Sequence, residues 1–200
     1  MCTTLEAKHH RISAEKSALL ICDIQEKFSP HIVCFKEMVE NCKRLIDVAA
    51  LLNMKIVATE QYPKGLGKTV SQLEIDEYNV PVFEKLQFTM CLPQLMKEIE
   101  GVKSVILCGV ECHVCILQTV LDMLDKGISV YVVADATSSR SKTDRFFGIR
   151  QMERAGAVVT TTETILLGLI GGADHPKFKE VQKIIKTPSA DTKLLLDLSR

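Results

Sequence analysis

The sequence has no excess of either charge, because 25 lysines and arginines balance 25 aspartates and glutamates. A balance of this kind gives no sign of binding to nucleic acid or to an acidic membrane surface. The chain also lacks any apolar run that approaches the roughly 18 residues needed by a membrane-spanning helix. We therefore expect no nucleic-acid partner and no insertion into a membrane.

The N-terminal segment has no apolar core, and the eight cysteines are not arranged as in a small secreted domain. Cys22 and Cys108 lie inside apolar, strand-like runs, whereas disulfide-rich domains are short and loop-rich. We therefore expect no signal peptide and a reducing intracellular compartment, and we predict a cytoplasmic protein. The residues leave a mitochondrial or nuclear location open.

Several binding motifs are missing as well. No second C-x-x-C and no H-x3–5-H accompanies Cys112 and Cys115, as a structural zinc site would require. The KGLGKT segment at 64–69 lacks the spacing of a phosphate-binding loop. No repeat or linker divides the chain, so we expect one domain over residues 15–188. An N-terminal tail (1–14) and a C-terminal tail (189–200) complete the expected organisation.

Apolar, strand-like runs alternate with amphipathic helical segments along most of the chain. The expected strands are 17–24, 55–60, 79–85, 103–108, 128–136 and 157–163, and the expected helices are 35–52, 92–99, the stretch after Gly109 up to 126, 143–155, 165–170 and 178–186. Residues 60–78 are expected to form a long loop. This alternation predicts an α/β fold with a mostly parallel sheet that is covered by helices on both faces.

Several polar residues follow these strands directly. The carboxyl ends of parallel strands share one edge of a sheet, where binding and catalytic sites are built. The residues in question are Asp23, Glu60, Lys85, the 109–115 turn and Asp135. We therefore expect them in one crevice.

Cys115 is the strongest candidate for a nucleophile. It follows a strand and a glycine turn, and it stands at the start of an apolar helix, whose dipole favours a thiolate. Asp23 can take the thiol proton, and Lys85 can stabilise both anions. A small buried cysteine, a capping aspartate and a surface lysine are the structural alternatives, and the residues alone leave them open.

Cys112 and Cys115 also form a C-x-x-C at the start of a helix, which is the placement of thioredoxin-like redox motifs. Thioredoxin-like domains are smaller than this chain, and their motif follows an early strand. A thiol redox protein nevertheless remains an alternative to a hydrolase. A third alternative is a catalytically idle protein that acts by binding a partner protein.

Several segments, taken in order, resemble the isochorismatase-like cysteine hydrolase family over roughly residues 15–188. They are ALLICDIQEKF, TEQYPKGLGKTV, FEKLQFTM, GVECHVCI, VVADATSSR and GAVVTTTE. The resemblance implies a three-layer α/β/α sandwich with a Rossmann-like sheet in the strand order 3-2-1-4-5-6, and it implies a homo-oligomer. It also implies catalytic roles for Asp23, Lys85 and Cys115, with Cys115 as the nucleophile.

The resemblance further implies a non-proline cis peptide bond at Val110–Glu111. Backbone N–H groups of Glu111 and Cys115 are then expected to form an oxyanion hole. Cys112 stands where many relatives have a hydroxyl group. The residues expected to line the substrate pocket are Gln25, Phe28, Gln61, Tyr62, Phe88 and Cys112.

Two departures from other members narrow the expected chemistry. Nicotinamidases of the family bind a metal through an Asp-x-His pair after the second strand, where this chain has Glu60-Gln61-Tyr62. We therefore expect no metal and no other cofactor, and nicotinamide is disfavoured as a substrate. True isochorismatases, which cleave a vinyl ether, lack the nucleophilic cysteine. The sequence thus predicts hydrolysis of an amide-like C–N bond in a small molecule, through a thioester intermediate.

Overall fold

A single parallel sheet forms the centre of the computed structural model, which describes residues 12–194. Residues 195–200 and most of the expected N-terminal tail lie outside the described residues. The strands are β1 (Ser17–Cys22), β2 (Lys55–Gln61), β3 (Val82–Lys85), β4 (Ser104–Gly109), β5 (Ser129–Thr137) and β6 (Val158–Thr160). Their order is β3-β2-β1-β4-β5-β6, and each neighbouring pair is parallel. The predicted fold class and strand order are confirmed.

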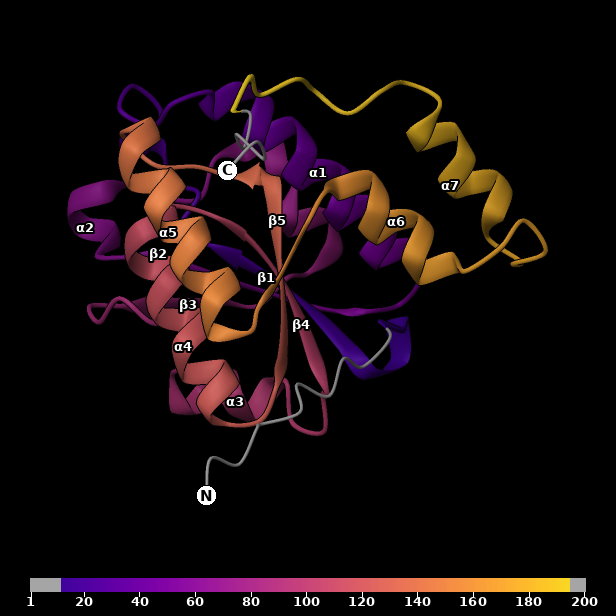
Figure 1. Ribbon diagram of the computed structural model, residues 1–200, viewed down its shortest axis with the longest axis horizontal. Helices are drawn as coiled ribbons and strands as arrows, with labels where there is room; N and C mark the ends of the chain where they lie inside the picture. The colour runs from indigo at the N-terminus through magenta and orange to yellow at the C-terminus, as the bar shows by residue number, and fades with distance from the viewer. Residues whose placement is uncertain (1–11, 195–200) are drawn as a thin grey trace.

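Helices cover both faces of the sheet (Figure 1). One face carries α1 (Phe35–Leu51), α6 (Thr162–Ile170) and α7 (Phe178–Ile185), and the other carries α3 (Pro93–Glu98), α4 (Leu117–Asp125) and α5 (Lys142–Ala155). Alternate residues of β1 point to opposite faces, so Leu19 and Ile21 pack toward α1, whereas Leu20 and Cys22 pack toward α4. No helix within residues 12–194 is long and apolar enough to cross a lipid bilayer.

The segment between β2 and β3 is more structured than the expected loop. It contains the short helix α2 (Pro63–Leu66) and two 3-10 turns, at Ser71–Leu73 and Ile75–Tyr78. These elements are too short for an apolar periodicity to appear in the sequence. β3 begins later than expected, at Val82, because the preceding Pro81 has no N–H to contribute to a ladder.

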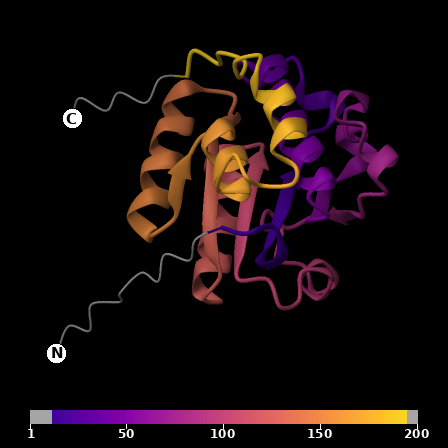
Figure 2. The same cartoon turned by 90° about the vertical axis from the view of Figure 1, so that its right-hand side faces the viewer.

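The described part of the C-terminal tail is bound to the domain. The chain runs from α7 across one edge of the molecule toward α5 (Figures 1 and 2). Asn41 of α1, which is fully buried, exchanges hydrogen bonds with the backbone of Ala190. Arg145 of α5 donates to the carbonyl of Leu194 at 3.4 Å. Buried donors on two helices therefore hold this segment in place.

The carboxyl ends of β1 and β4 approach each other closely at Gly109. Gly109 pairs with Cys22 in the register of the two strands, and its φ is +116°. A Cβ at this position would lie 2.1 Å from the carbonyl oxygen of Cys22. The N–H of Val110 donates to the same oxygen at 2.9 Å. The absence of a side chain at Gly109 therefore allows the two strand ends to lie side by side.

We predict that Gly109→Ala lowers the free energy of unfolding by at least about 3 kcal/mol, because a steric clash adds to backbone strain. Gly127→Ala is the matched control, since Gly127 also has a positive φ (+74°) but no atom within 4 Å of an added Cβ. Strain alone should cost this control about 1–2 kcal/mol. Urea unfolding measures both losses, and equal losses would contradict the close contact of β1 with β4.

Candidate active site

The carboxylate of Asp23 is the centre of the candidate site. Asp23 directly follows β1, has a φ of 50° and is fully buried. The hydroxyl of Thr59 donates to Oδ1 at 2.8 Å, and the ammonium of Lys85 donates to Oδ2 at 2.7 Å. Both oxygens of the carboxylate thus have partners, as a charge in the protein interior requires. Thr59 is in place because it lies opposite Cys22 in the β1–β2 register.

Lys85, the last residue of β3, supplies the positive charge. Its ammonium has no exposed surface, and it also donates to Oε1 of Gln61 at 2.7 Å. Burial alone would lower the pKa of Lys85, but the electrostatic interactions with Cys22, Asp23 and Cys115 outweigh burial, and the pKa is raised. The ammonium therefore keeps its charge at neutral pH and compensates a negative charge on its neighbours.

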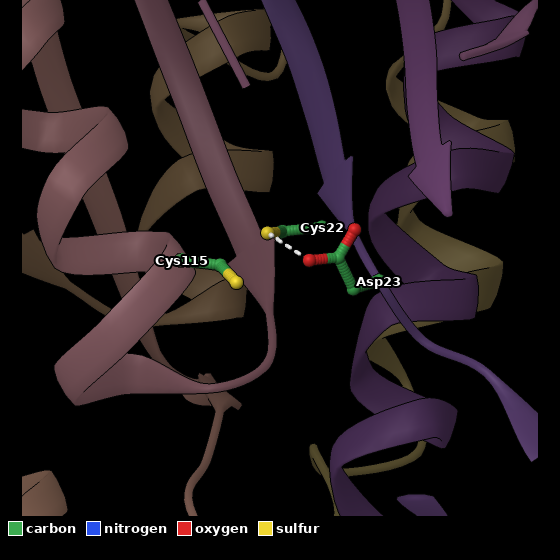
Figure 3. A group of neighbouring side chains, drawn as sticks. All are labelled: Cys22, Asp23 and Cys115. Carbon is green, nitrogen blue, oxygen red and sulfur yellow. Dashed lines mark hydrogen bonds between the residues drawn. The ribbon is translucent and has the colours of Figure 1, made fainter. Parts of the chain in front are cut away.

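Cys115 reaches the carboxylate from the neighbouring strand. β4 ends at Gly109, and the chain then enters a π-helical turn (Cys112–Ile116) that continues as α4. The sulfur atoms of Cys115 and Cys22 and a carboxylate oxygen of Asp23 all lie within 4.8 Å of one another (Figure 3). Cys115 is 6 % exposed, so solvent reaches the group at this residue. Single-turn π-helices are frequent at functional sites.

The turn before Cys115 has an unusual backbone. The Val110–Glu111 peptide bond is cis, at the position expected from the sequence. The carbonyl of Glu111 accepts from the N–H of Ile116 at 3.2 Å, which closes the π-turn. Within residues 12–194, the Glu111 amide donates no backbone hydrogen bond outside the regular elements, and the Cys115 amide lies inside the π-turn. These two amides are the donors expected for an oxyanion hole.

Arg140 holds the side chain of Glu111. Its Nε donates to Oε2 at 3.0 Å and its Nη2 to Oε1 at 2.6 Å, which is a bidentate pair. Burial alone would raise the pKa of Glu111, but the hydrogen bonds from Arg140 outweigh it and lower the pKa. The ion pair thus anchors the side chain next to the cis bond.

Cys112 lies apart from the Asp23 group. Its thiol donates to the carbonyl of Arg145 at 3.6 Å, and burial raises its pKa to about 12. A π-turn has more residues per turn than an α-helix, so Cys112 and Cys115 do not share one face as they would in an α-helix. The structure brings Cys22, and not Cys112, into the group that contains Cys115.

Gln25 and Gln61, two of the expected pocket residues, position other groups. The side chain of Gln25 is fully buried, accepts from the N–H of Gln61 at 2.7 Å and donates to the carbonyl of Gly67 at 2.8 Å. Gln61 uses its own amide to bind Lys85 and the carbonyl of Leu86, each at 2.7 Å. Gln25 therefore joins β2 to the following loop, and Gln61 orients the ammonium.

Two further expected residues, Tyr62 and Phe88, form an aromatic rim beside Lys85, and the N–H of Tyr62 donates to the Lys85 carbonyl at 2.9 Å. Tyr62 is 51 % exposed and Phe88 is 55 % exposed, and the Phe88 carbonyl accepts from the buried ammonium at 2.9 Å. Phe28 lines a cavity of about 650 Å³ together with Leu66 and Arg140. The rim thus offers apolar surface to a ligand near the Asp23 group.

The prediction that Glu60 and Asp135 share the crevice is wrong. Side chains alternate along a strand, so Thr59 faces the site and the adjacent Glu60 points away from it. The Glu60 carboxylate accepts from the N–H of Thr69 at 2.7 Å, and Asp135 accepts from the N–H of Thr162 at 2.8 Å. Both carboxylates stabilise backbone outside the Asp23 group.

In the sequence, neither Cys22 nor Thr59 stands out as a site residue. Cys22 appears there as part of an apolar strand, and Thr59 as an ordinary strand residue. Their proximity depends on the register that pairs Cys22 with Thr59 and with Gly109. The position of Cys22 directly before Asp23 is the one sequence signal that points to it.

Two thiols and a carboxylate are also donors that a soft divalent cation accepts. Both oxygens of Asp23 are already engaged, however, and the Lys85 ammonium lies 2.7 Å from one of them. A metal ion would add a second positive charge beside this ammonium. The group is therefore better suited to proton transfer than to binding a metal ion.

Comparisons with known proteins point to one family. Residues 17–164 match the Isochorismatase domain. Isochorismatase domain-containing protein 2 of Xenopus laevis is 46 % identical over 188 residues, which cover 92 % of this chain and 91 % of that protein. The human protein of the same name is 44 % identical, with 92 % and 90 % covered.

Solved structures resemble the whole domain. A structure described as the MAR1 ribonuclease from Caenorhabditis elegans is 52 % identical, has a TM-score of 0.90, and covers 94 % of this chain and 98 % of its own. YcaC from Pseudomonas aeruginosa, described with hexane-2,5-diol and covalent acrylamide, is 22 % identical with a TM-score of 0.79, and 88 % and 92 % of the chains are covered. The second structure shares the fold.

We predict that Lys85→Met lowers the free energy of unfolding by about 3–5 kcal/mol, because it leaves the Asp23 carboxylate buried without its ion pair. Lys68→Met is the control, since Lys68 pairs with Glu60 at 3.0 Å but is 70 % exposed. An exposed pair contributes about 0–1 kcal/mol.

Adding Asp23→Asn to Lys85→Met should recover part of the loss, since it removes the uncompensated charge. Urea unfolding of the two single variants and the double variant measures these energies. A loss for Lys85→Met that is no larger than the loss for Lys68→Met would show that the buried pair has no special role in stability.

Proposed function

The chain belongs to the isochorismatase family, and on this premise we propose that it is a cysteine hydrolase that cleaves an amide-like C–N bond in a small molecule. The observation that carries the proposal is the grouping of the Cys115 thiol with the Asp23 carboxylate, within 4.8 Å, beside the Lys85 ammonium. A nucleophile, a base and a compensating cation are the parts that covalent acyl transfer requires.

In the first step, Asp23 takes the proton of Cys115 while the sulfur attacks the carbonyl carbon of the substrate. Lys85 supports this step because its hydrogen bond to Oδ2, at 2.7 Å, holds the carboxylate in place beside the thiol. Burial strengthens these interactions, since water does not screen the charges.

The tetrahedral anion that forms needs hydrogen-bond donors. We assign this role to the amides of Glu111, which directly precedes the π-turn, and of Cys115, which lies within it. The intermediate collapses when Asp23 returns the proton to the leaving amine, and an acyl group remains on Cys115 as a thioester. A water molecule then gives a proton to Asp23 and attacks the thioester, the C–S bond breaks, the acid leaves, and Asp23 returns the proton to the Cys115 sulfur.

The surroundings of the group favour a small substrate with an apolar part. Tyr62 and Phe88 expose aromatic rings at the rim beside Lys85. We also propose a homo-oligomer, in which a neighbouring subunit covers part of this rim. The YcaC gene product from Escherichia coli is described as an octameric hydrolase.

Cleavage of RNA is a second candidate function, because the Caenorhabditis elegans structure with 52 % identity is described as a ribonuclease. RNA binding relies on cations that contact phosphates. This chain has a formal net charge of zero, and the ammonium of its candidate site is already paired with Asp23. These charges favour a neutral amide over a phosphodiester as the substrate.

We predict that the wild-type protein releases ammonia or an amine from at least one compound in a panel of small amides. Cys115→Ala should lower this rate by at least about 10³-fold, because it removes the nucleophile while deleting little volume. Cys91→Ala, which removes another free thiol outside the Asp23 group, should keep the rate. Circular dichroism checks that each variant is folded.

Labelled RNA is incubated with the same three proteins in parallel. Amide turnover that persists in Cys115→Ala would rule out the proposed mechanism. RNA cleavage that depends on Cys115, in a protein that turns over none of the amides, would establish the second function instead.

A further inference from the structure

Cys22 is a thiol that the proposed hydrolysis does not use. It ends β1, has no exposed surface, and its sulfur lies within 4.8 Å of the sulfur of Cys115. Figure 3 shows the two sulfur atoms facing each other beside Asp23. The thiol of Cys22 also donates to Oδ2 of Asp23 at 3.5 Å, the oxygen that accepts from Lys85. An apolar residue would fill the same space without these contacts.

We propose that Cys22 is a resolving thiol for Cys115: after a peroxide oxidises Cys115, the two residues form a disulfide that blocks the nucleophile and that a thiol reductant reverses. The inference does not depend on which bond the protein hydrolyses. It requires only that Cys115 reacts first and that Cys22 is its nearest thiol.

The chemistry is balanced with hydrogen peroxide as the oxidant. Asp23 takes the proton of Cys115, the sulfur attacks one peroxide oxygen, and the O–O bond breaks to give a sulfenic acid and hydroxide, which takes the proton back from Asp23 and leaves as water. Cys22 gives its proton to Asp23, and its sulfur displaces hydroxide from the sulfenic sulfur, which forms the S–S bond. The hydroxide takes up the proton and leaves as water. Two thiols are thereby oxidised and one peroxide is reduced.

The order of events follows from exposure and charge. Cys115 is 6 % exposed whereas Cys22 is fully buried, so the oxidant reaches Cys115 first. Burial, followed by the contact with Cys115 and the charge of Asp23, raises the pKa of Cys22, which therefore stays protonated until the sulfenic acid forms.

Reduction of the disulfide also begins at Cys115, the more exposed of the two residues. A small thiol attacks the Cys115 sulfur, forms a mixed disulfide there and releases Cys22, and a second thiol then restores Cys115. The path from contact to bond is short, because a disulfide needs its sulfurs about 2.05 Å apart and these begin within 4.8 Å. The bond would link the end of β1 to the start of α4.

Cys42 and Cys108 provide an internal control. They lie next to each other on the opposite face of the sheet, and burial together with the contact between them raises the pKa of Cys42. Both residues are fully buried, and the groups that shift the pKa of Cys42 do not include Lys85. We therefore expect this pair to stay reduced under conditions that link Cys22 to Cys115.

The test is non-reducing peptide mapping of the intact protein after treatment with one equivalent of hydrogen peroxide. Trypsin releases Cys22 in peptide 17–27, Cys115 in peptide 104–126 and Cys42 in peptide 37–43. We expect peptides 17–27 and 104–126 to be linked, with a mass lower by two hydrogen atoms. Fragmentation should place the bond on Cys115, and peptide 37–43 should remain unlinked.

Recovery of the thiol gives a second readout. After an excess of hydrogen peroxide and then dithiothreitol, wild-type Cys115 should again react with iodoacetamide, whereas in Cys22→Ala a second equivalent of peroxide oxidises the sulfenic acid to sulfinic acid. We expect the recovered fraction to be at least about fivefold lower in Cys22→Ala. Cys112→Ala, altered in the same peptide as Cys115, should form the link and recover like the wild type.

Peptide mapping of the wild type decides the proposal even where Cys22→Ala fails to fold. Added oxygen on Cys115 with Cys22 unlinked would overturn it, and so would a bond from Cys115 to Cys112. Because the readouts are disulfide bonds and alkylation, a negative result leaves the hydrolase proposal untouched. Loss of amide turnover in the earlier experiment likewise leaves this proposal untouched.

Discussion

A buried ion pair between Asp23 and Lys85 joins three adjacent strands at the carboxyl edge of the sheet. Asp23 follows β1, Lys85 ends β3, and β2 between them contributes the Thr59 hydroxyl and the Gln61 amide. Neither charge has exposed surface, so each depends on the other and on the polar groups of β2. The backbone after β3 supplies a further hydrogen-bond acceptor, because the carbonyl of Phe88 accepts from the Lys85 ammonium.

The same edge brings a thiol to the pair through close packing of backbone. Gly109 allows β4 to lie against Cys22, and the π-turn that follows sets Cys115 near the Asp23 carboxylate. Leu20 and Cys22 share the face that α4 covers, so the side of the sheet that anchors the helix also holds the second sulfur. The register of β1 and β4 thus determines both the packing of this face and the position of Cys22 beside Cys115.

Much of this arrangement can be predicted from the sequence, because the signals are local. Continuous apolar runs identify buried parallel strands. The polar residues at the ends of these runs, such as Asp23 and Lys85, can then be predicted to lie at the carboxyl edge of the sheet. Cys22 and Thr59 cannot be assigned in this way, since their role depends on which strands are neighbours and in what register. Glu60 shows the opposite failure, because it ends a strand as expected but alternation turns its side chain away from the site.

Trapping an acyl-enzyme tests the role of Cys115 most directly. Turnover of an amide substrate is stopped in acid within the first cycle. The mass of tryptic peptide 104–126 is then measured, and the peptide is fragmented to locate any added group. We predict that Cys115 carries the acyl part of the substrate without its amine, that hydroxylamine removes this group, and that Cys115→Ala never acquires it. Turnover with an unmodified peptide, or with the acyl group on another residue, would contradict nucleophilic attack by Cys115.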